Sequence, residues 1–257
     1  MAQRIDESVN AAMKNLIYGI NPLEEALQAG KTFDKIFVQR GQRNERIAAL
    51  MQQFRDLEIP VQLVPEEKLN RLTSKTHQGI VAFLTEVSFC KTDDVIAQAY
   101  AAGEVPLLLL ADRITDVRNF GALARTAYIA GVHGIIIPFS GAAALNEDAV
   151  KSSSGALTLI NLCREKDLVH CIKQLRLNGI QTLAADGLGT DLVEESDWTV
   201  PTCLILGSEG EGIEPAVLRL ADRIVKLPVV RAFDSYNVSV AAGMMLYECM
   251  RQRRKSS

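Results

Sequence analysis

Three polar stretches of the chain, at residues 112–125, 207–212 and 228–237, hold side chains that could bind a ligand or react with it. Asparagine, serine and glutamate can orient a polar substrate, and arginine can hold a phosphate or stabilise a developing negative charge. Glycine lets a ligand approach the main-chain amides closely. The polar side chains that could act in this way are Asn119, Arg125, Glu209, Ser235 and Asn237.

The glycine-rich stretch at 207–212 differs from phosphate-binding loops. It lacks the Gly-Lys-Ser/Thr ending of a P-loop. A dinucleotide-binding βαβ unit would require a G-x-G-x-x-G sequence after its first strand, and none follows the first strand here. Its carboxylates, Glu209 and Glu211, disfavour an anionic ligand and suit a cationic or neutral one. A structural glycine turn is the alternative here, and a helix-capping Asn119 with a surface Arg125 is the alternative for the first stretch.

The third stretch leads from a loop into a helix. Ser235 and Asn237 stand where their side chains would cap the free amides of the helix start, which also attracts polar or anionic ligand groups. An ordinary capped helix is the alternative. The residues that follow form one helical stripe that can pack closely on a neighbouring backbone, made of Val238, Ala241, Ala242 and Met245.

Apolar strands alternate with helices around these stretches, which predicts a parallel sheet covered on both faces. Ligands of such sheets bind beyond the carboxyl ends of the strands, where the polar stretches lie. The expected strands of the second half are 107–111, 134–138, 159–162, 180–185 and 202–206, and the expected helices are 121–130, 146–153 and 167–177.

The first part of the chain predicts a smaller α/β unit. Asn21 followed by Pro22 is typical of a helix start. The expected elements are helices at 21–30, 44–57 and 65–72, with strands at 35–39, 61–64 and 79–84. We therefore expect a flexible leader at 1–13, a domain at 14–87, a linker at 88–104 and a second domain at 105–257.

Composition restricts the partners. The chain has 257 residues, 48% of them hydrophobic, a net charge of −3 and a pI near 5.7, so a nucleic-acid footprint would have to be local. A solvated face is the alternative for the basic positions of the front unit, and the arginines near the C-terminus are expected to complement the dipole of the last helix. The candidate RNA contacts are Arg40, Arg43, Arg46, Arg113 and Arg118.

Five scattered cysteines, an odd number, indicate reduced thiols in a cytoplasm rather than a disulfide framework. Cys163, His170 and Cys171 lie close in sequence, but no second ligand pair follows at zinc-finger spacing, so we expect no metal. We expect no secretory signal, because the first residues contain no apolar segment of the kind found in signal peptides. We expect no membrane span, because no apolar segment is long enough to cross a bilayer.

Taken together, the three stretches resemble the motifs of SpoU-type (TrmH-like) RNA ribose 2′-O-methyltransferases. The segments 119–125 and 206–212 resemble the first and second motifs, and Leu227-Pro228 with 235–241 resembles the third. Tyr18-Gly19 and the segment 77–82 resemble the ribosomal-protein-L30e-like substrate-binding domain of the branch that methylates guanosine in 23S ribosomal RNA.

The resemblance implies an α/β SPOUT domain with a deep trefoil knot, a homodimer, and S-adenosylmethionine as methyl donor. It places Asn119, Arg125, Glu209, Ser235 and Asn237 on the catalytic positions. Family members often have Leu at the position of Tyr236 and Gly at that of Arg231. The positions implied for the cofactor are Leu206, Gly207, Gly210, Leu227, Tyr236 and Asn237.

The reaction implied is attack of a ribose 2′-oxygen on the sulfonium methyl group. Because an ordinary arginine loses its proton only near pH 12.5, we favour a cationic Arg125 that holds the adjacent phosphate and stabilises the alkoxide, with a proton-accepting Arg125 as the alternative. Alternative functions are the same reaction on transfer RNA or another ribosomal site, and a non-catalytic RNA-binding or ribosome-assembly protein. A nicotinamide-dependent oxidoreductase is disfavoured because the glycine loop follows a late strand, and no DNA partner is expected.

Overall fold

The structure, a computed structural model, describes residues 15–85, 87–231 and 235–256. The leader expected at 1–13 lies outside these residues. The described chain forms two compact units, which are treated separately. The first comprises the residues up to Ser88 with Leu145–Asp148, and the second comprises Phe89–Ala144 and the chain from Ala149 onward.

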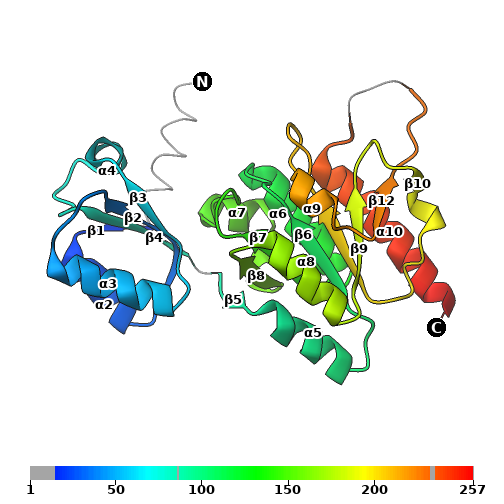
Figure 1. The fold of residues 1–257 in the computed structure, drawn as a ribbon, viewed down its shortest axis with the longest axis horizontal. Coiled ribbons are helices and arrows are strands. Elements are labelled where there is room, and N and C mark those ends of the chain that lie inside the picture. The colour runs from blue at the N-terminus through cyan, green and yellow to red at the C-terminus, as the bar shows by residue number, and fades with distance from the viewer. Residues whose placement is uncertain (1–14, 86, 232–234, 257) are drawn as a thin grey trace. The chain divides into compact units, whose positions relative to one another are not determined.

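The first unit is a four-stranded sheet with helices on both faces (Figure 1). β4 runs antiparallel to β1 and β2, and β2 pairs with β3 in parallel. Ile36 and Val38 of β2 pack with α2 and α3, while Phe37 between them packs with α4 on the other face. In sheet order the strands are β1 (Leu16–Tyr18), β4 (Ile80–Thr85), β2 (Thr32–Gln39) and β3 (Val61–Val64), and the helices are α2 (Ile20–Gln28), α3 (Glu45–Asp56) and α4 (Glu66–Leu72).

The start of α2 differs from the prediction. The helix begins at Ile20 with Gly19 as its N-cap, so Asn21 is not the cap residue. Gln78 supplies the missing acceptor, because its Oε1 accepts a hydrogen bond from the Ile20 amide at 2.9 Å. A contact between residues 58 positions apart has no local sequence signal, which explains the error.

The second unit is an eight-stranded sheet in which all neighbouring strands are parallel. The predicted α/β class is therefore confirmed, while the trefoil knot stays a prediction. In sheet order the strands are β10 (Asp191–Leu192), β12 (Arg223–Lys226), β9 (Gln181–Ala185), β11 (Thr202–Leu206), β6 (Leu107–Ala111), β7 (Gly134–Pro138), β8 (Asn161–Glu165) and β5 (Phe89–Cys90).

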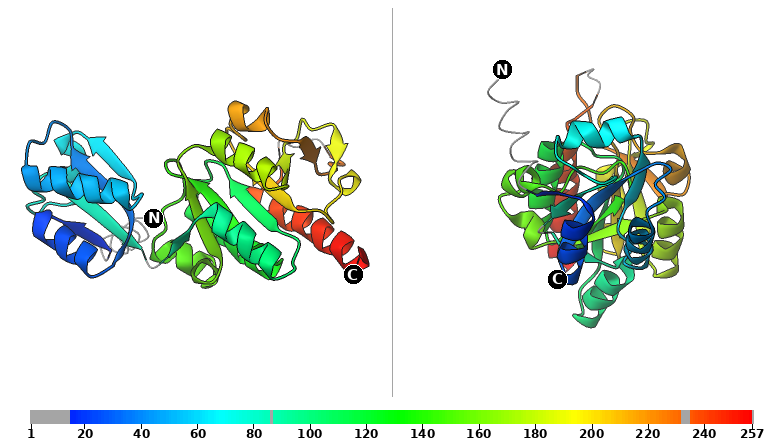
Figure 2. Two further views of the ribbon diagram at one scale, coloured as in Figure 1. Left: turned by 60° about the horizontal axis from the view of Figure 1, so that its bottom comes forward. Right: turned by 90° about the vertical axis from the view of Figure 1, so that its left-hand side faces the viewer.

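Helices cover both faces of this sheet, as Figures 1 and 2 show. On one face α5 (Thr92–Ala101), α8 (Leu168–Leu177) and α9 (Pro215–Leu218) pack on alternate residues of the strands, including Leu108 and Leu110. On the other, α6 (Val117–Ile129) packs against α10 (Val238–Ser256). Shorter helical segments are α7 (Glu147–Ser152), η1 (Ala156–Thr158) and η2 (Val193–Glu195).

The segment 88–104, expected to be a linker, instead belongs largely to the second unit. It forms β5 at the sheet edge and α5, whose Val95 and Ile96 are 2% exposed in the core. This helix is rich in alanine, so its apolar face gives only a weak sequence signal.

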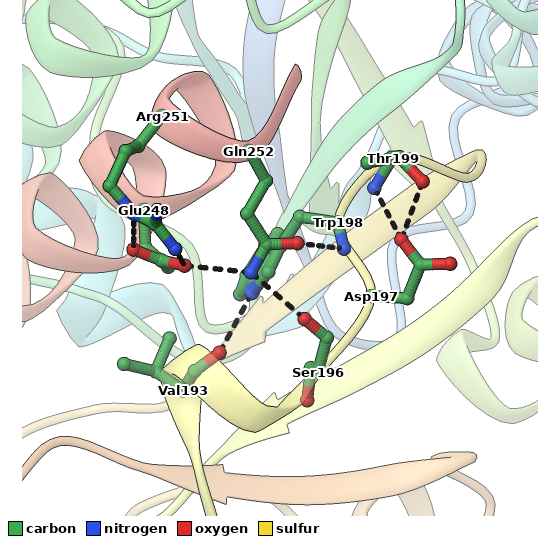
Figure 3. Close-up of polar contacts among 8 residues, drawn as sticks. All are labelled: Val193, Ser196, Asp197, Trp198, Thr199, Glu248, Arg251 and Gln252. Carbon is green, nitrogen blue, oxygen red and sulfur yellow. Dashed lines mark hydrogen bonds and ion pairs between the residues drawn. The ribbon is translucent and has the colours of Figure 1, made fainter. Parts of the chain in front are cut away.

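The last turns of α10 hold the 193–199 segment through hydrogen bonds (Figure 3). Gln252 accepts a hydrogen bond from the Trp198 amide at 3.0 Å, and the fully buried indole donates to the Val193 carbonyl at 2.9 Å. Arg253, expected to complement the helix dipole, donates to four carbonyl oxygens outside α10. These carbonyls belong to Val105, Pro106, Trp198 and Val200.

All five cysteines are free. Within the described ranges, no helix is long and apolar enough to span a bilayer, and no group of three or more His, Cys, Asp or Glu residues is placed to hold a metal ion.

Candidate functional site

The first two polar stretches meet because β6 and β11 are adjacent parallel strands. Ala111 pairs with Leu206 at their carboxyl ends, and the amide of Asp112 donates to the Leu206 carbonyl at 2.8 Å. Asp116 then caps α6, since its carboxylate accepts from the Asn119 amide at 2.8 Å. Asn119 therefore lies in the first turn of α6, directly beside the loop that follows β11.

The side chains of Asn119, Glu209 and Asn237 converge and bond to one another. The side-chain amide of Asn119 donates a hydrogen bond to Glu209 Oε1 at 3.0 Å. The side-chain amide of Asn237 donates to the same oxygen at 2.5 Å and to Asn119 Oδ1 at 3.0 Å. All three of the predicted motifs thus contribute one side chain to a single hydrogen-bonded cluster, which we call the Asn–Glu–Asn triangle.

Asn237 also starts α10. Its Oδ1 accepts hydrogen bonds from the amides of Ser239 at 3.0 Å and Val240 at 3.4 Å, so the side chain caps the helix while its amide faces Glu209. The Val238 amide adds a 3.4 Å contact to Glu209 Oε1. Among the described residues, Glu209 Oε2 accepts no hydrogen bond, which leaves this oxygen available to a ligand.

The glycine loop folds back on itself next to the triangle. Ser208 and Gly212 form an isolated antiparallel bridge. A Cβ on Gly207 would lie 2.1 Å from the main-chain carbon of Gly212, so only glycine fits there. A Cβ on Gly210 would meet no atom within 4 Å, so the main chain is open on that side.

Arg113, which was predicted to contact RNA, bonds to the glycine loop. Its guanidinium donates to Glu211 at 2.7 Å and to the Gly212 carbonyl at 3.3 Å. Its Nε lies 3.4 Å from Oδ1 of the buried Asp112, whose Oδ2 accepts from the Glu214 amide at 2.5 Å. Asp112 was missed as a site residue, although its place directly after a buried strand is a usable signal.

Arg125 stands apart from the triangle. It lies six residues after Asn119 on α6, or about 9 Å further along the helix axis, and its side chain is exposed. Its Nη1 donates to the hydroxyl of Ser154 at 3.1 Å. Ser154 was not among the predicted site residues.

The remaining positions of the third motif differ in burial. Leu227 is 8% exposed at the end of β12, and Leu206 is 2% exposed at the end of β11. The Tyr236 hydroxyl donates to the Pro228 carbonyl at 3.1 Å, which joins the chain leaving β12 to the chain entering α10. Ser235 is exposed and bonds to no other described residue.

The arginines expected to contact RNA fall into two groups. Arg46 pairs with Glu24 at 2.5 Å, and this hydrogen bond raises the pKa of the guanidinium. Like Arg113, it is therefore already neutralised by a protein carboxylate. The exposed side chains of Arg40, Arg43 and Arg118 bond to no other residue that the structure describes.

Comparisons with known proteins agree with this architecture. Residues 106–247 match the model of the SpoU rRNA methylase family, and residues 16–90 match the model described as RNA 2′-O ribose methyltransferase substrate binding. A protein of Staphylococcus saprophyticus named as a TrmH family tRNA/rRNA methyltransferase is 32% identical over 93% of this chain and 96% of its own. The SpoU methyltransferase AviRb of Streptomyces viridochromogenes, solved with its cofactor AdoMet, is 26% identical with a TM-score of 0.59, covering 93% of this chain and 90% of that one.

A further relative is 30% identical over 92% of this chain and 95% of its own, a Bacillus subtilis protein named as a TrmH family tRNA/rRNA methyltransferase. The chain belongs to the SpoU rRNA methylase family. It is an RNA methyltransferase by class.

Proposed function

We propose that this enzyme transfers a methyl group from S-adenosylmethionine to a ribose 2′-hydroxyl of RNA, most specifically a guanosine of 23S ribosomal RNA. The observation that carries the proposal is the Asn–Glu–Asn triangle, because it brings together one polar side chain from each of the three motifs. The triangle lies beyond the carboxyl ends of parallel strands, where such sheets bind ligands.

The residues around the triangle suit the proposed cofactor. Open main chain at Gly210 and the exposed segment after the buried Leu227 offer amides and carbonyls to a neutral adenosine. The carboxylate of Glu209, with Oε2 available, suits a cationic sulfonium and amino group better than a phosphate. When bound there, S-adenosylmethionine supplies the methyl group as an electrophile.

The protein side chains then have separate tasks. The triangle fixes the loop after β11 against the starts of α6 and α10, so that the cofactor side of the site is preformed. Arg125 keeps its positive charge, holds the phosphate next to the target ribose, and stabilises negative charge that develops on the 2′-oxygen. Asn119 and Asn237 orient the groups around Glu209.

RNA affinity in this proposal comes from arginines whose side chains bond to no other described residue. Arg40 and Arg43 lie in the unit that matches the substrate-binding model, and Arg118 lies at the start of α6. Replacing Arg40 and Arg43 by alanine should weaken RNA binding and flatten its salt dependence, because each lost phosphate contact lowers the slope by about 0.7 to 0.9. Arg46→Ala is the control, since Glu24 already neutralises that guanidinium.

We also propose a homodimer formed through the outer surface of α6 and α10. Val240, Met244 and Tyr247 recur at helical spacing on α10 and are 39–60% exposed, and Tyr128 and Ile129 of α6 are 45% and 69% exposed. A second copy of the chain would bury this apolar surface. Val240→Glu combined with Tyr247→Glu should shift the sedimentation coefficient from that of a dimer to that of a monomer, and a wild-type monomer would contradict the proposal.

A methylation assay can distinguish 23S ribosomal RNA from transfer RNA as the substrate. The chain is incubated with tritiated S-adenosylmethionine and either a 23S ribosomal transcript or bulk transfer RNA, and the label is counted. Label in the 23S transcript alone supports the proposal, while label in transfer RNA supports the second candidate, since the names of the relatives include both tRNA and rRNA. Failure to bind S-adenosylhomocysteine in calorimetry would favour a non-catalytic RNA-binding protein. A cytoplasmic location, where the five cysteines stay reduced, belongs to the same proposal.

A further inference from the structure

The turn that follows α7 has an unusual conformation at Ser154. Its φ is 53°, and Gly155 follows with a φ of 86°, so two consecutive residues adopt left-handed backbone angles. Glycine and asparagine adopt this region more readily than serine does. Three other non-glycine residues, Glu58, Gln78 and Arg113, adopt a similar φ, so a role for Ser154 depends on the contacts of its side chain.

The two preceding serines fix this turn against its surroundings. Ser152 Oγ lies 3.0 Å from the Ala149 carbonyl oxygen and 3.2 Å from that of Val117 in α6, and its single proton can be donated to either. A Cβ on Gly121 would lie 1.9 Å from Ser152 Oγ. Ser153 is fully buried, and its hydroxyl accepts from the Leu157 amide at 3.2 Å. The turn is thus held closely against α6, and only a glycine at position 121 permits the approach.

This close approach brings Ser154 to Arg125. Gly121 and Arg125 are four residues apart on α6 and therefore share one face of the helix. The turn that packs on Gly121 places the Ser154 hydroxyl 3.1 Å from Nη1 of Arg125. Because the Ser154 amide bonds to the Lys151 carbonyl at 3.0 Å, the hydroxyl is presented from a closed, hydrogen-bonded turn.

The partner of Arg125 is a neutral hydroxyl, whereas Arg46 and Arg113, which were expected to contact RNA, bond to carboxylates. Arg46 bonds to Glu24, and Arg113 bonds to Glu211. Within the described part of the chain, Arg125 bonds only to Ser154. A hydroxyl oxygen can orient a guanidinium without cancelling its charge, and it leaves the other N–H groups for a substrate phosphate.

We infer that Ser154 is a positioning residue for methyl transfer, which holds the charged guanidinium of Arg125 toward the substrate RNA. The inference rests on the proposed function and adds a residue to it. Ser154 touches Arg125 and acts through it.

Three variants separate positioning from a purely structural role. Ser154→Gly removes the acceptor and relaxes the backbone, so the melting temperature should stay or rise while kcat falls about tenfold, as expected for a lost hydrogen bond to a charged group. Ser154→Asn suits the left-handed conformation and restores an acceptor oxygen, so it should recover most of the lost kcat. Thr158→Ala, which removes a hydroxyl of the same turn that bonds to Gly155 instead, should keep wild-type kcat.

The decisive readout is a double-mutant cycle with Arg125→Lys, measured as methyl transfer to a 23S ribosomal transcript at saturating cofactor. Positioning predicts that Ser154→Gly lowers kcat in the wild-type background and changes it less than twofold in Arg125→Lys. Equal losses in both backgrounds, or a wild-type kcat for Ser154→Gly, would overturn the inference and leave the proposed function standing. A wild-type chain that neither binds S-adenosylhomocysteine nor transfers methyl groups would overturn both.

Discussion

The side-chain amide of Asn237 donates to Glu209 Oε1 at 2.5 Å and to Asn119 Oδ1 at 3.0 Å, although Asn119 and Asn237 are 118 positions apart. The oxygen of the same side chain caps α10. One residue therefore couples the start of the last helix to the loop after β11 and to the start of α6.

Replacing Asn237 by aspartate tests this coupling. Aspartate caps helices as well as asparagine does, but it places a second carboxylate against Glu209 where an amide donor stood. We expect at least a tenfold loss of kcat/KM at pH 8 with α10 still folded by circular dichroism. Asn237→Ser, which caps without adding charge, should lose less, and equal activity of both variants with wild type would contradict the role of the amide.

The glycine loop permits a matched pair of substitutions. Gly207→Ala would force a Cβ to within 2.1 Å of the Gly212 main chain, so the loop must shift and S-adenosylhomocysteine binding should fall at least tenfold. Gly210→Ala meets no atom within 4 Å in the free protein. Circular dichroism and calorimetry of both variants check the prediction, and a Gly207→Ala protein with wild-type affinity would contradict it.

The Tyr236 hydroxyl bonds to the Pro228 carbonyl and so joins the chain leaving β12 to the chain entering α10. Tyr236→Phe should weaken S-adenosylhomocysteine binding about three- to tenfold, because a net hydrogen bond worth about 1 kcal/mol no longer joins the two ends of the loop. Tyr100→Phe is a matched control, since it removes a hydroxyl-to-carbonyl bond of the same 3.1 Å length in α5. Equal calorimetric affinities for the two variants would show that the Tyr236 bond does not support the site.

The strands that are buried on both faces could be predicted from sequence. The bounds expected for β6, β7 and β11 equal the observed ones, because continuous aliphatic segments between polar turns leave little ambiguity. By contrast, β5 and α5 were expected as a linker, and the Gln78 contact that starts α2 lies 58 positions away.

In the candidate site, too, some features could be predicted from the sequence and others could not. The three motifs could be located from their residue types and their order in the chain. Asn119, Glu209 and Asn237 lie in segments that follow the carboxyl ends of β6, β11 and β12, which favours their convergence. The pairing of Arg113 with Glu211 and the contact of Arg125 with Ser154 depend on tertiary packing across 98 and 29 positions. No local pattern encodes such distances.

Arg253 joins α10 to the amino-terminal ends of β6 and β11 through four carbonyl oxygens. Arg253→Ala should lower the free energy of unfolding by about 3 kcal/mol, because several charged hydrogen bonds are lost. Arg254→Ala is the control, since among the described residues its exposed side chain bonds only to the Met250 carbonyl within its own helix. Urea unfolding of the two variants measures the difference in their free energies of unfolding. Equal unfolding midpoints would contradict a stabilising role for the Arg253 hydrogen bonds.

Burial raises the pKa of the Cys163 thiol from 9.0 to about 12, and it raises the pKa of Cys203 as well. The folded state then holds these protons more tightly than the unfolded chain does. The contribution of these thiols to the free energy of unfolding is therefore fully present below pH 9 and is lost progressively as the pH rises above 9. Each such thiol should contribute a loss of about 1.4 kcal/mol per pH unit above pH 9. Cys203→Ala should show a shallower decline than wild type between pH 9 and 10.5, and parallel declines would contradict the assignment.

We propose that three converging loops direct a methyl group to a ribose oxygen. The most direct test is to incubate the enzyme with tritiated S-adenosylmethionine and a 23S ribosomal transcript and then to hydrolyse the RNA in alkali. Because a 2′-O-methyl group blocks alkaline cleavage, we expect label in alkali-stable dinucleotides, and loss of that label with Glu209→Gln. Label in mononucleotides, which marks base methylation, or no transfer to any RNA would contradict it.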